Sequence, residues 1–267
     1  MSIYRSLVLF TFPMVYSFHT RYKGVTGVFA WLIKYFLPCL MVSVLQEDFS
    51  LSLFIFGMIY IYEFYELGYI QNDCETIKKE SHPTLRLSQE ELSVYERFKY
   101  LIICIRLIEI AFISWLLYFY GVRISILIVY ACTLIVFMIY NHVRNGFCLV
   151  IHLVLMMLRY TAPLVIATGR FDVLPMVLLL FIYPITLFVE RSVKGKFEYR
   201  SKFLSKFVLS SYEERYVFRI KYYACLLGVF VLLAYMNYCP ILVVTPVILL
   251  LLSSIITFKN KKLQYNK

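Results

Sequence analysis

The sequence has few charged residues and a small polar fraction. Asp, Glu, Lys and Arg make up 16% of its 267 residues, whereas hydrophobic residues make up 61% and the mean hydropathy is +0.76. Soluble domains are about 45–50% apolar, so this chain has too few polar side chains to cover a water-soluble globule. The net charge of +11 would suggest a nucleic-acid partner, but the composition excludes a soluble nucleic-acid binder and indicates an integral membrane protein.

Several other signals are missing. No CxxC pair occurs among the seven cysteines, and single thiols within apolar runs are typical of a reducing compartment. Residues 6–18 lack the small-residue cleavage site of a signal peptide and are too short to span a bilayer, so we expect an interfacial or re-entrant helix there. No repeat, low-complexity tract or soluble domain is visible. We therefore expect one domain over residues 1–267, with cytoplasmic cap loops near 71–97 and 191–219.

What the sequence does contain is a series of long apolar runs. A helix needs roughly 20 apolar residues to cross a bilayer, and eight runs have about that length. They predict an all-α, polytopic transmembrane bundle, and we further expect its helices to surround a central cavity that opens to the cytoplasmic face. The expected spans are 25–45, 50–70, 98–119, 123–141, 146–168, 172–190, 220–237 and 239–258.

The basic residues predict the orientation of these spans. One set of loops carries 22 Lys and Arg residues, whereas the opposite set carries only Arg123 and Arg170. Lys and Arg are concentrated in cytoplasmic loops of membrane proteins. Both termini and both long polar loops are therefore expected on the cytoplasmic side.

The second apolar run ends in a dense polar cluster, "YELGYIQNDCETIKKESHPTLRLS" (65–88). Asn72 and Glu80 are eight residues apart, and Asp73 and Glu80 are seven apart. A continuing helix would place these oxygen-bearing side chains on one face. Carboxylates, water and substrate phosphates are the ligands that Mg²⁺ prefers. The pattern therefore predicts a magnesium site at the membrane surface.

Basic side chains in the same cluster, Lys79 and Arg86, are suited to hold a phosphate. The alternative is a solvated juxtamembrane loop whose charges simply face water. Glu63 and Glu66 argue against that alternative, because they lie within the apolar run, where ionisable groups are costly and usually functional.

The stretch "GYIQNDCETIKKESHPTLR" resembles the first signature of the UbiA superfamily of intramembrane prenyltransferases, which reads roughly N-D-x-x-D-x-x-x-D. Asn72 and Asp73 match its opening and Glu80 matches its last acid, whereas Thr76 replaces the middle acid. The resemblance implies that Asn72, Asp73 and Glu80 are catalytic residues that bind Mg²⁺. It also implies a usual count of nine spans, one more than the eight found, and a bacterial inner (plasma) membrane location.

A second stretch, "YNHVRNGFCLVIHLVLMMLRYTAPLVIATG" (140–169), is similar to the fourth loop and fifth helix of the same superfamily. Tyr140 and Arg144 match its tyrosine and following basic residue. Arg159 and the "ATG" that follows resemble one branch, the polyprenyl-phosphate phosphoribosyltransferases. The resemblance implies that the substrate phosphate is bound by Lys79, Arg86, Tyr140, Arg144 and Arg159.

The second acidic signature of the superfamily is altered. The corresponding place reads "FVERSVKGKFEYRSKF", where Glu190, Lys194 and Glu198 recur every four residues. A lysine stands where a carboxylate is expected. Either the substrate is not the usual allylic diphosphate, or catalysis is weakened.

Two buried arginines are also expected to matter. Arg106 and Glu109 are three residues apart on one helix, which indicates either a buried ion pair or a wall of the phosphate site. Arg159 has no partner nearby in the sequence, and an unpaired arginine in a bilayer is costly. We expect it to meet Glu63, Glu66, Glu109 or a ligand phosphate.

Three functions remain open at this stage. The resemblance implies a UbiA-family membrane prenyltransferase that uses Mg²⁺ and an isoprenoid phosphate or diphosphate. A second possibility is transfer of a phosphoribosyl or other sugar-phosphate group to polyprenyl phosphate, for cell-envelope polysaccharide synthesis. The third is a non-catalytic isoprenoid-lipid binder or transporter, which the altered acids at Thr76 and Lys194 favour and the retained Asn72, Asp73 and Glu80 oppose.

Overall fold

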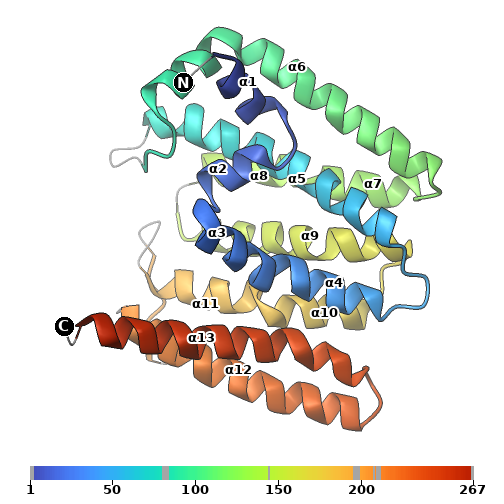
Figure 1. Cartoon of the computed structure of the whole chain (residues 1–267), viewed down its shortest axis with the longest axis vertical. Coiled ribbons are helices and arrows are strands. Elements are labelled where there is room, and N and C mark those ends of the chain that lie inside the picture. Colours follow the sequence, from blue (N-terminus) through green and yellow to red (C-terminus); the bar gives the residue numbers. More distant parts are fainter. Residues whose placement is uncertain are drawn as a thin grey trace.

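The computed structural model describes residues 3–79, 84–143, 145–194, 199–206, 208 and 212–265, without the side chains of 79, 212–214 and 261–265. These residues form helices joined by turns and short connections, with no strand among them (Figure 1). The expectation of an all-α fold is confirmed.

Seven of the described helical segments are long and apolar enough to cross a membrane. A further pair, α10 (Val173–Ile182) and α11 (Pro184–Val193), meets the same criterion only as one segment bent by 42°. The seven segments match seven of the eight expected runs, and the bent pair matches the eighth run, 172–190. The seven segments are Gly24–Val44, Leu51–Lys78, Gln89–Phe119, Ile124–His142, Phe147–Thr168, Arg215–Tyr235 and Ile241–Asn260.

Helix ends follow recognisable capping signals. The Ser50 side chain accepts a hydrogen bond from the Leu53 N–H at the start of α5 (Leu51–Cys74). Ser88 and Glu91 form a reciprocal capping box at the start of α6 (Gln89–Phe119), as expected for an S-x-x-E sequence. Helix α6 thus begins nine residues before the expected span, and the connection after α5 is much shorter than a loop over 71–97.

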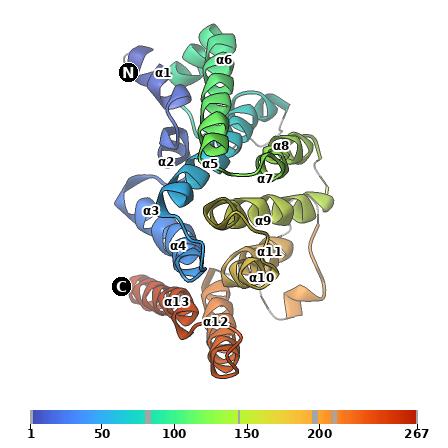
Figure 2. The ribbon, with the colours of Figure 1, turned by 90° about the vertical axis from the view of Figure 1, so that its right-hand side faces the viewer.

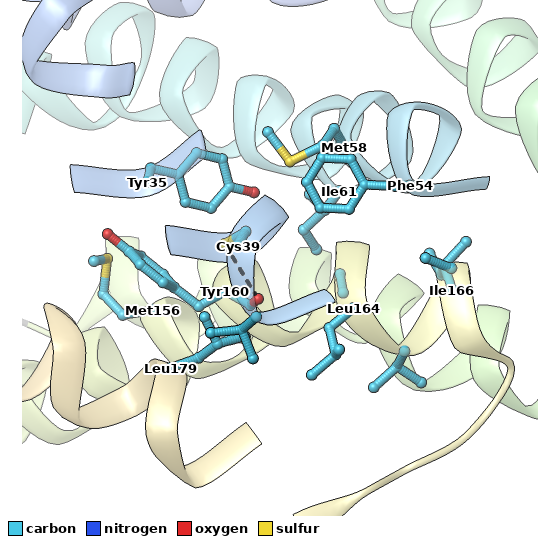
Figure 3. Close-up of a cluster of buried hydrophobic side chains, with 14 of the residues drawn as sticks. Tyr35, Cys39, Phe54, Met58, Ile61, Met156, Tyr160, Leu164, Ile166 and Leu179 are labelled. Carbon is cyan, nitrogen blue, oxygen red and sulfur yellow. Dashed lines mark hydrogen bonds between the residues drawn. The ribbon is translucent and has the colours of Figure 1, made fainter. Parts of the chain in front are cut away.

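The centre of the bundle is built from α5 and α9 (Phe147–Thr168), which pack against each other and are the two most buried spans. Figure 3 shows the apolar core between them, where Tyr35, Phe54 and Met58 face Tyr160 and Leu164. Close approach on the other side of α5 requires Gly68, because a Cβ there would lie 2.3 Å from the Phe137 ring of α8 (Thr133–His142).

Three outer elements surround this centre. Helix α8 follows α7 (Ile124–Ala131), and together they pack beside α5 and α9. The hairpin of α12 (Tyr212–Tyr235) and α13 (Val244–Tyr265) lies at the opposite end from α6 (Figure 1). Outer faces expose large apolar side chains such as Ile108, Phe112 and Trp115 on α6, which suits contact with membrane lipid.

Breaks in two spans place polar groups inside the bundle. The first span consists of α3 (Gly24–Trp31), a π-helical turn (Leu32–Phe36) and α4 (Leu37–Val44), and Lys34 lies in the π turn. Tyr183 has a non-helical backbone at the break between α10 and α11, directly before Pro184. Local π turns and proline breaks re-aim side chains and occur often at functional sites.

Residues 6–18, expected as one short helix, form parts of two. Helices α1 (Ile3–Thr11) and α2 (Val15–Thr20) pack against α6 and α5 respectively, beside each other at one end of the bundle (Figure 2). Neither is long enough to span.

A buried ion cluster fastens this N-terminal hairpin to the bundle. The fully buried Arg106 of α6 lies 2.9 Å from Glu63 and 2.8 Å from Glu66, both on α5, and 3.6 Å from Glu109. Its guanidinium also donates to the carbonyls of Phe10 and Phe12, and Glu66 accepts the Met14 and Ser17 backbone N–H groups. We call Arg106, Glu63, Glu66 and Glu109 the Arg106 cluster. It goes beyond the expected Arg106–Glu109 pair, and it gives Glu63 and Glu66 a structural role.

Candidate functional site

A cavity of about 1050 Å³ lies between the end of α2 and helices α3, α5, α8, α9 and α11. Five cationic side chains from separate elements line it: Arg21, Lys34, Arg86, Arg159 and Arg191. Among the described lining residues, Glu75 alone has a carboxylate, and that carboxylate lies 2.6 Å from the ammonium of Lys99. The cavity therefore carries excess positive charge and is suited to bind an anion.

The remaining wall combines phenol groups with apolar surface. Seven tyrosines line the cavity, among them Tyr22, Tyr35 and Tyr65. Leu155 and Met156 of α9 add an apolar strip beside them. A ligand with an anionic end and a hydrophobic body would match this division of the wall.

Arg159 is the most deeply placed cation of the cavity. It is 4% exposed, donates to the hydroxyl of Tyr22 at 2.8 Å and to that of Tyr62, and its guanidinium carbon lies 4.3 Å from the centre of the Tyr35 ring. Phenol oxygens and ring faces stabilise a cation in part. We call this arrangement the tyrosine cage: Arg159 with Tyr22, Tyr35, Tyr62 and Tyr65.

No described carboxylate pairs with Arg159, and its Nε atom has no hydrogen-bond partner among the described residues. The expectation that it meets Glu63, Glu66 or Glu109 is wrong, because the Arg106 cluster occupies those carboxylates. A buried cation without a counter-ion is costly unless a ligand supplies the opposite charge. The other expected partner, a ligand phosphate, stays a prediction.

Asp73 of the first motif is held in a dense hydrogen-bond network at the end of α5. Its carboxylate, 1% exposed, accepts from Arg21, Arg86, Tyr16 and Asn72 at 2.9–3.1 Å. Burial and the negative charge of Asp73 raise the pKa of Tyr16 well above its ordinary value, so Tyr16 stays a neutral donor. Asp73 does not line the cavity, whereas Asn72, Arg21 and Arg86 do.

These contacts bear on the predicted magnesium site. Both oxygens of Asp73 are engaged, the Asn72 amide nitrogen donates to Asp73, and Glu80 lies outside the described residues. No group of three His, Cys, Asp or Glu side chains within the described part of the chain gathers as metal ligands. The described residues thus do not fit a metal ligand set in this arrangement, and Mg²⁺ binding stays a prediction.

The other predicted phosphate ligands divide into three groups. Arg86, Arg159 and Tyr140 line the one cavity, and Tyr140 packs between the rings of Phe137 and His152. Arg144 and the side chain of Lys79 lie outside the described residues. The structure therefore brings three of the five predicted residues together.

Glu190 and Lys194 of the altered second motif do not line the cavity. Glu190 is buried and pairs with Arg219 of α12, whose Nη2 donates to it at 2.8 Å. Lys194 caps the C-terminal end of α11 with much of its side chain exposed, and partial desolvation of its ammonium, together with the positive charge of Arg215, lowers its pKa. Glu198 lies outside the described residues. The cavity is lined instead by Arg191, the residue next to Glu190.

Three lining cations were not predicted as site residues. Arg21 and Arg191 appear in the sequence as ordinary members of basic juxtamembrane segments, and Lys34 appears as a lysine that reaches the membrane surface. In the structure Lys34 turns to the cavity and lies 5.9 Å from the Tyr183 ring. A cation within an apolar run was the available signal for Lys34, whereas Arg21 and Arg191 carry no comparable signal.

No protein-family model, curated protein or solved structure matches this chain. The resemblance to the UbiA superfamily therefore stays a prediction that rests on the motif residues alone.

Proposed function

We propose that this protein is an integral membrane transferase of the UbiA type that acts on an isoprenoid phosphate or diphosphate. The observation that carries the proposal is Arg159, a buried cation without a described counter-ion, in a cavity whose described lining has five cationic side chains and one carboxylate. An anionic head group would supply the missing charge. The isoprenoid body would lie along the apolar strip of α9.

The transfer step follows from simple bond accounting. The bond between the allylic carbon and the diphosphate oxygen breaks, and the diphosphate leaves with the electron pair. A nucleophilic atom of the acceptor forms the new bond to that carbon and loses its proton. Arginine side chains stabilise the negative charge that develops on the leaving diphosphate. If Mg²⁺ is bound when the substrate enters, it adds to this neutralisation.

The charge of the cavity favours a second candidate, transfer of a sugar-phosphate group from a diphosphate donor to polyprenyl phosphate. Both substrates of that reaction are anionic, whereas prenyl transfer to a neutral acceptor needs only one anion site. The cations stand on separate elements, with Arg191 on α11 and Arg86 before α6. Such a distribution is suited to hold two phosphorylated ligands.

The test uses purified full-length protein in liposomes that contain isoprenoid phosphates, supplied with Mg²⁺ and a panel of diphosphate donors. We expect pyrophosphate release by the wild type and by Arg97→Gln, an exposed arginine away from the cavity, and at least tenfold less by Arg159→Gln. Mass spectrometry of the lipid products separates prenyl from sugar-phosphate transfer. If the protein binds an isoprenoid phosphate but releases pyrophosphate from none of the donors, it is instead a non-catalytic lipid binder.

The location is part of the same proposal. The cavity is placed at the cytoplasmic side of a bacterial inner membrane, with both chain termini in the cytoplasm. The support is the distribution of Lys and Arg between the two sets of loops.

A further inference from the structure

The first-motif aspartate joins two arginines that come from different parts of the chain. Arg21 follows α2, and its guanidinium nitrogens lie 2.8 and 3.1 Å from the two Asp73 oxygens. Arg86 precedes α6, and its Nη1 lies 2.9 Å from Asp73 Oδ1. We call Arg21 and Arg86 the arginine pair. One carboxylate between two guanidinium groups leaves a net positive charge at this point of the cavity wall.

The arginine pair retains capacity for a second anion. A guanidinium has five N–H donors in a fixed fork, and Asp73 accepts one hydrogen bond from each arginine. Both side chains line the cavity, and they are 16% and 28% exposed, whereas the Asp73 side chain is 1% exposed. The arginines are therefore accessible from the cavity and the aspartate is not.

The surroundings restrict how Asp73 can act. The Tyr16 hydroxyl and the Asn72 amide complete its hydrogen bonds, and the Tyr69 ring lies 4.3 Å from the Arg21 guanidinium. A divalent ion at Asp73 would have to displace two guanidinium groups and a phenol from an almost fully buried carboxylate. Replacing that many charge-assisted hydrogen bonds in a site of low dielectric constant is costly.

We infer that Arg21 and Arg86 bind the phosphate or diphosphate end of the isoprenoid substrate directly, and that Asp73 is a positioning residue that orients them rather than a metal ligand. The inference rests on the proposed function and specifies how its substrate is bound. Planar guanidinium forks match phosphate oxygens in a bidentate geometry. When the carbon–oxygen bond breaks, the diphosphate leaves with the bonding electrons, and the arginine pair stabilises the negative charge that develops on it.

The experiment measures binding of farnesyl thiolodiphosphate, a non-hydrolysable probe, to purified full-length protein in detergent by titration calorimetry. Each titration is run once with Mg²⁺ and once with excess EDTA. We expect the two wild-type affinities to agree within about threefold. Arg21→Gln and Arg86→Gln should each weaken binding about tenfold or more in both buffers, since each loses charge-assisted hydrogen bonds. Arg97→Gln should bind like the wild type.

Asp73→Asn separates positioning from metal binding. A positioning role predicts the same weakening of affinity with Mg²⁺ and with EDTA. Arg86→Lys, which keeps the charge but loses the fork, should bind between the wild type and Arg86→Gln. Arg86→Lys also keeps the inference testable if the Asp73 variant misfolds. Arg86 is the more exposed residue of the arginine pair, so its substitution disturbs the fold less.

Two results would overturn the inference and leave the proposed function standing. One is binding that disappears in EDTA, returns with Mg²⁺ and loses this dependence in Asp73→Asn. The other is metal-independent binding that neither arginine substitution weakens. Failure of the wild type to bind the probe and isoprenoid monophosphate in both buffers would instead defeat the proposed function, and the inference with it.

Discussion

Two buried arginines in this protein have opposite surroundings, and the difference separates a structural residue from a candidate functional one. Arg106 meets two carboxylates at 2.8–2.9 Å and two backbone carbonyls. Arg159 meets only phenol groups and ring faces among the described residues. A protein keeps an uncompensated buried cation at a cost in stability. We therefore expect Arg106 to contribute mainly to folding, and we propose that Arg159 binds the ligand.

Substitution of Arg106 is expected to destabilise the protein strongly. Arg106→Met leaves Glu63 and Glu66 buried without a counter-charge, which costs about 3–5 kcal/mol in comparable sites. Unfolding in detergent, followed by tryptophan fluorescence, measures the change. A variant as stable as the wild type would show that the Arg106 cluster does not hold the N-terminal hairpin.

Substitution of Arg159 is expected to have the opposite profile. Arg159→Met loses contacts with the tyrosine cage but also removes an unpaired buried charge, so the free energy of unfolding should stay within about 1 kcal/mol of the wild type. Binding of an isoprenoid diphosphate should fall at least tenfold in the same preparation. A loss of stability as large as that of Arg106→Met would mean that Arg159 is structural.

At the scale of elements, the N-terminal hairpin is a wall of the site as well as a surface element. Helix α2 is anchored by Glu66, which accepts backbone N–H groups of Met14 and Ser17. The residues after α2, Arg21 and Tyr22, line the cavity and contact Asp73 and Arg159. The anchoring of α2 therefore determines where these two side chains lie.

Glu66→Gln is expected to loosen this hairpin without unfolding the bundle. The amide replaces one accepting oxygen with a donor, which cannot accept from backbone N–H groups. Hydrogen exchange over residues 3–22 should become faster, while exchange over α12 and α13, at the opposite end of the bundle from α1 (Figure 1), stays unchanged. Equal exchange at residues 3–22 in both proteins would contradict the anchoring role.

The spans were predictable from the sequence because the length and apolarity of each run determine them. The direction in which individual side chains point was not predictable. The runs 146–168 and 50–70 became α9 and α5 with small changes at the ends. Asn72 and Asp73 are neighbours in the motif, yet Asn72 lines the cavity and Asp73 turns to Arg21. Helical spacing shows which residues share a face, but it does not show whether that face meets a cavity or another helix. The π turn at Lys34 lies just before Pro38, which has no N–H to donate to the Lys34 carbonyl. Proline therefore signals the irregularity in the sequence, whereas the partner of that carbonyl, the Tyr160 hydroxyl, is set by tertiary packing.

At the scale of the whole molecule, the bent pair α10–α11 decides the topology. Seven crossings place the two chain termini on opposite sides of the membrane, and eight place them on the same side. The excess of Lys and Arg near both ends favours eight crossings, with both ends in the cytoplasm.

Topology reporters fused separately to the N- and C-termini test this count. We expect both fusions to report a cytoplasmic location, and a fusion within the connection between α9 and α10, near Arg170, to report the opposite side. A C-terminus on the side opposite to the N-terminus would show that α10 and α11 enter and leave by the same face.

The central claim is that the cationic cavity binds a phosphorylated isoprenoid through the buried guanidinium of Arg159. The most direct measurement is an experimental structure of the full-length protein with farnesyl thiolodiphosphate. The account predicts phosphate oxygens within hydrogen-bonding distance of the arginines that line the cavity, Arg159 included, and the prenyl chain along Leu155 and Met156. A ligand bound elsewhere, or a cavity filled by a neutral lipid chain with Arg159 still unpaired, would contradict it.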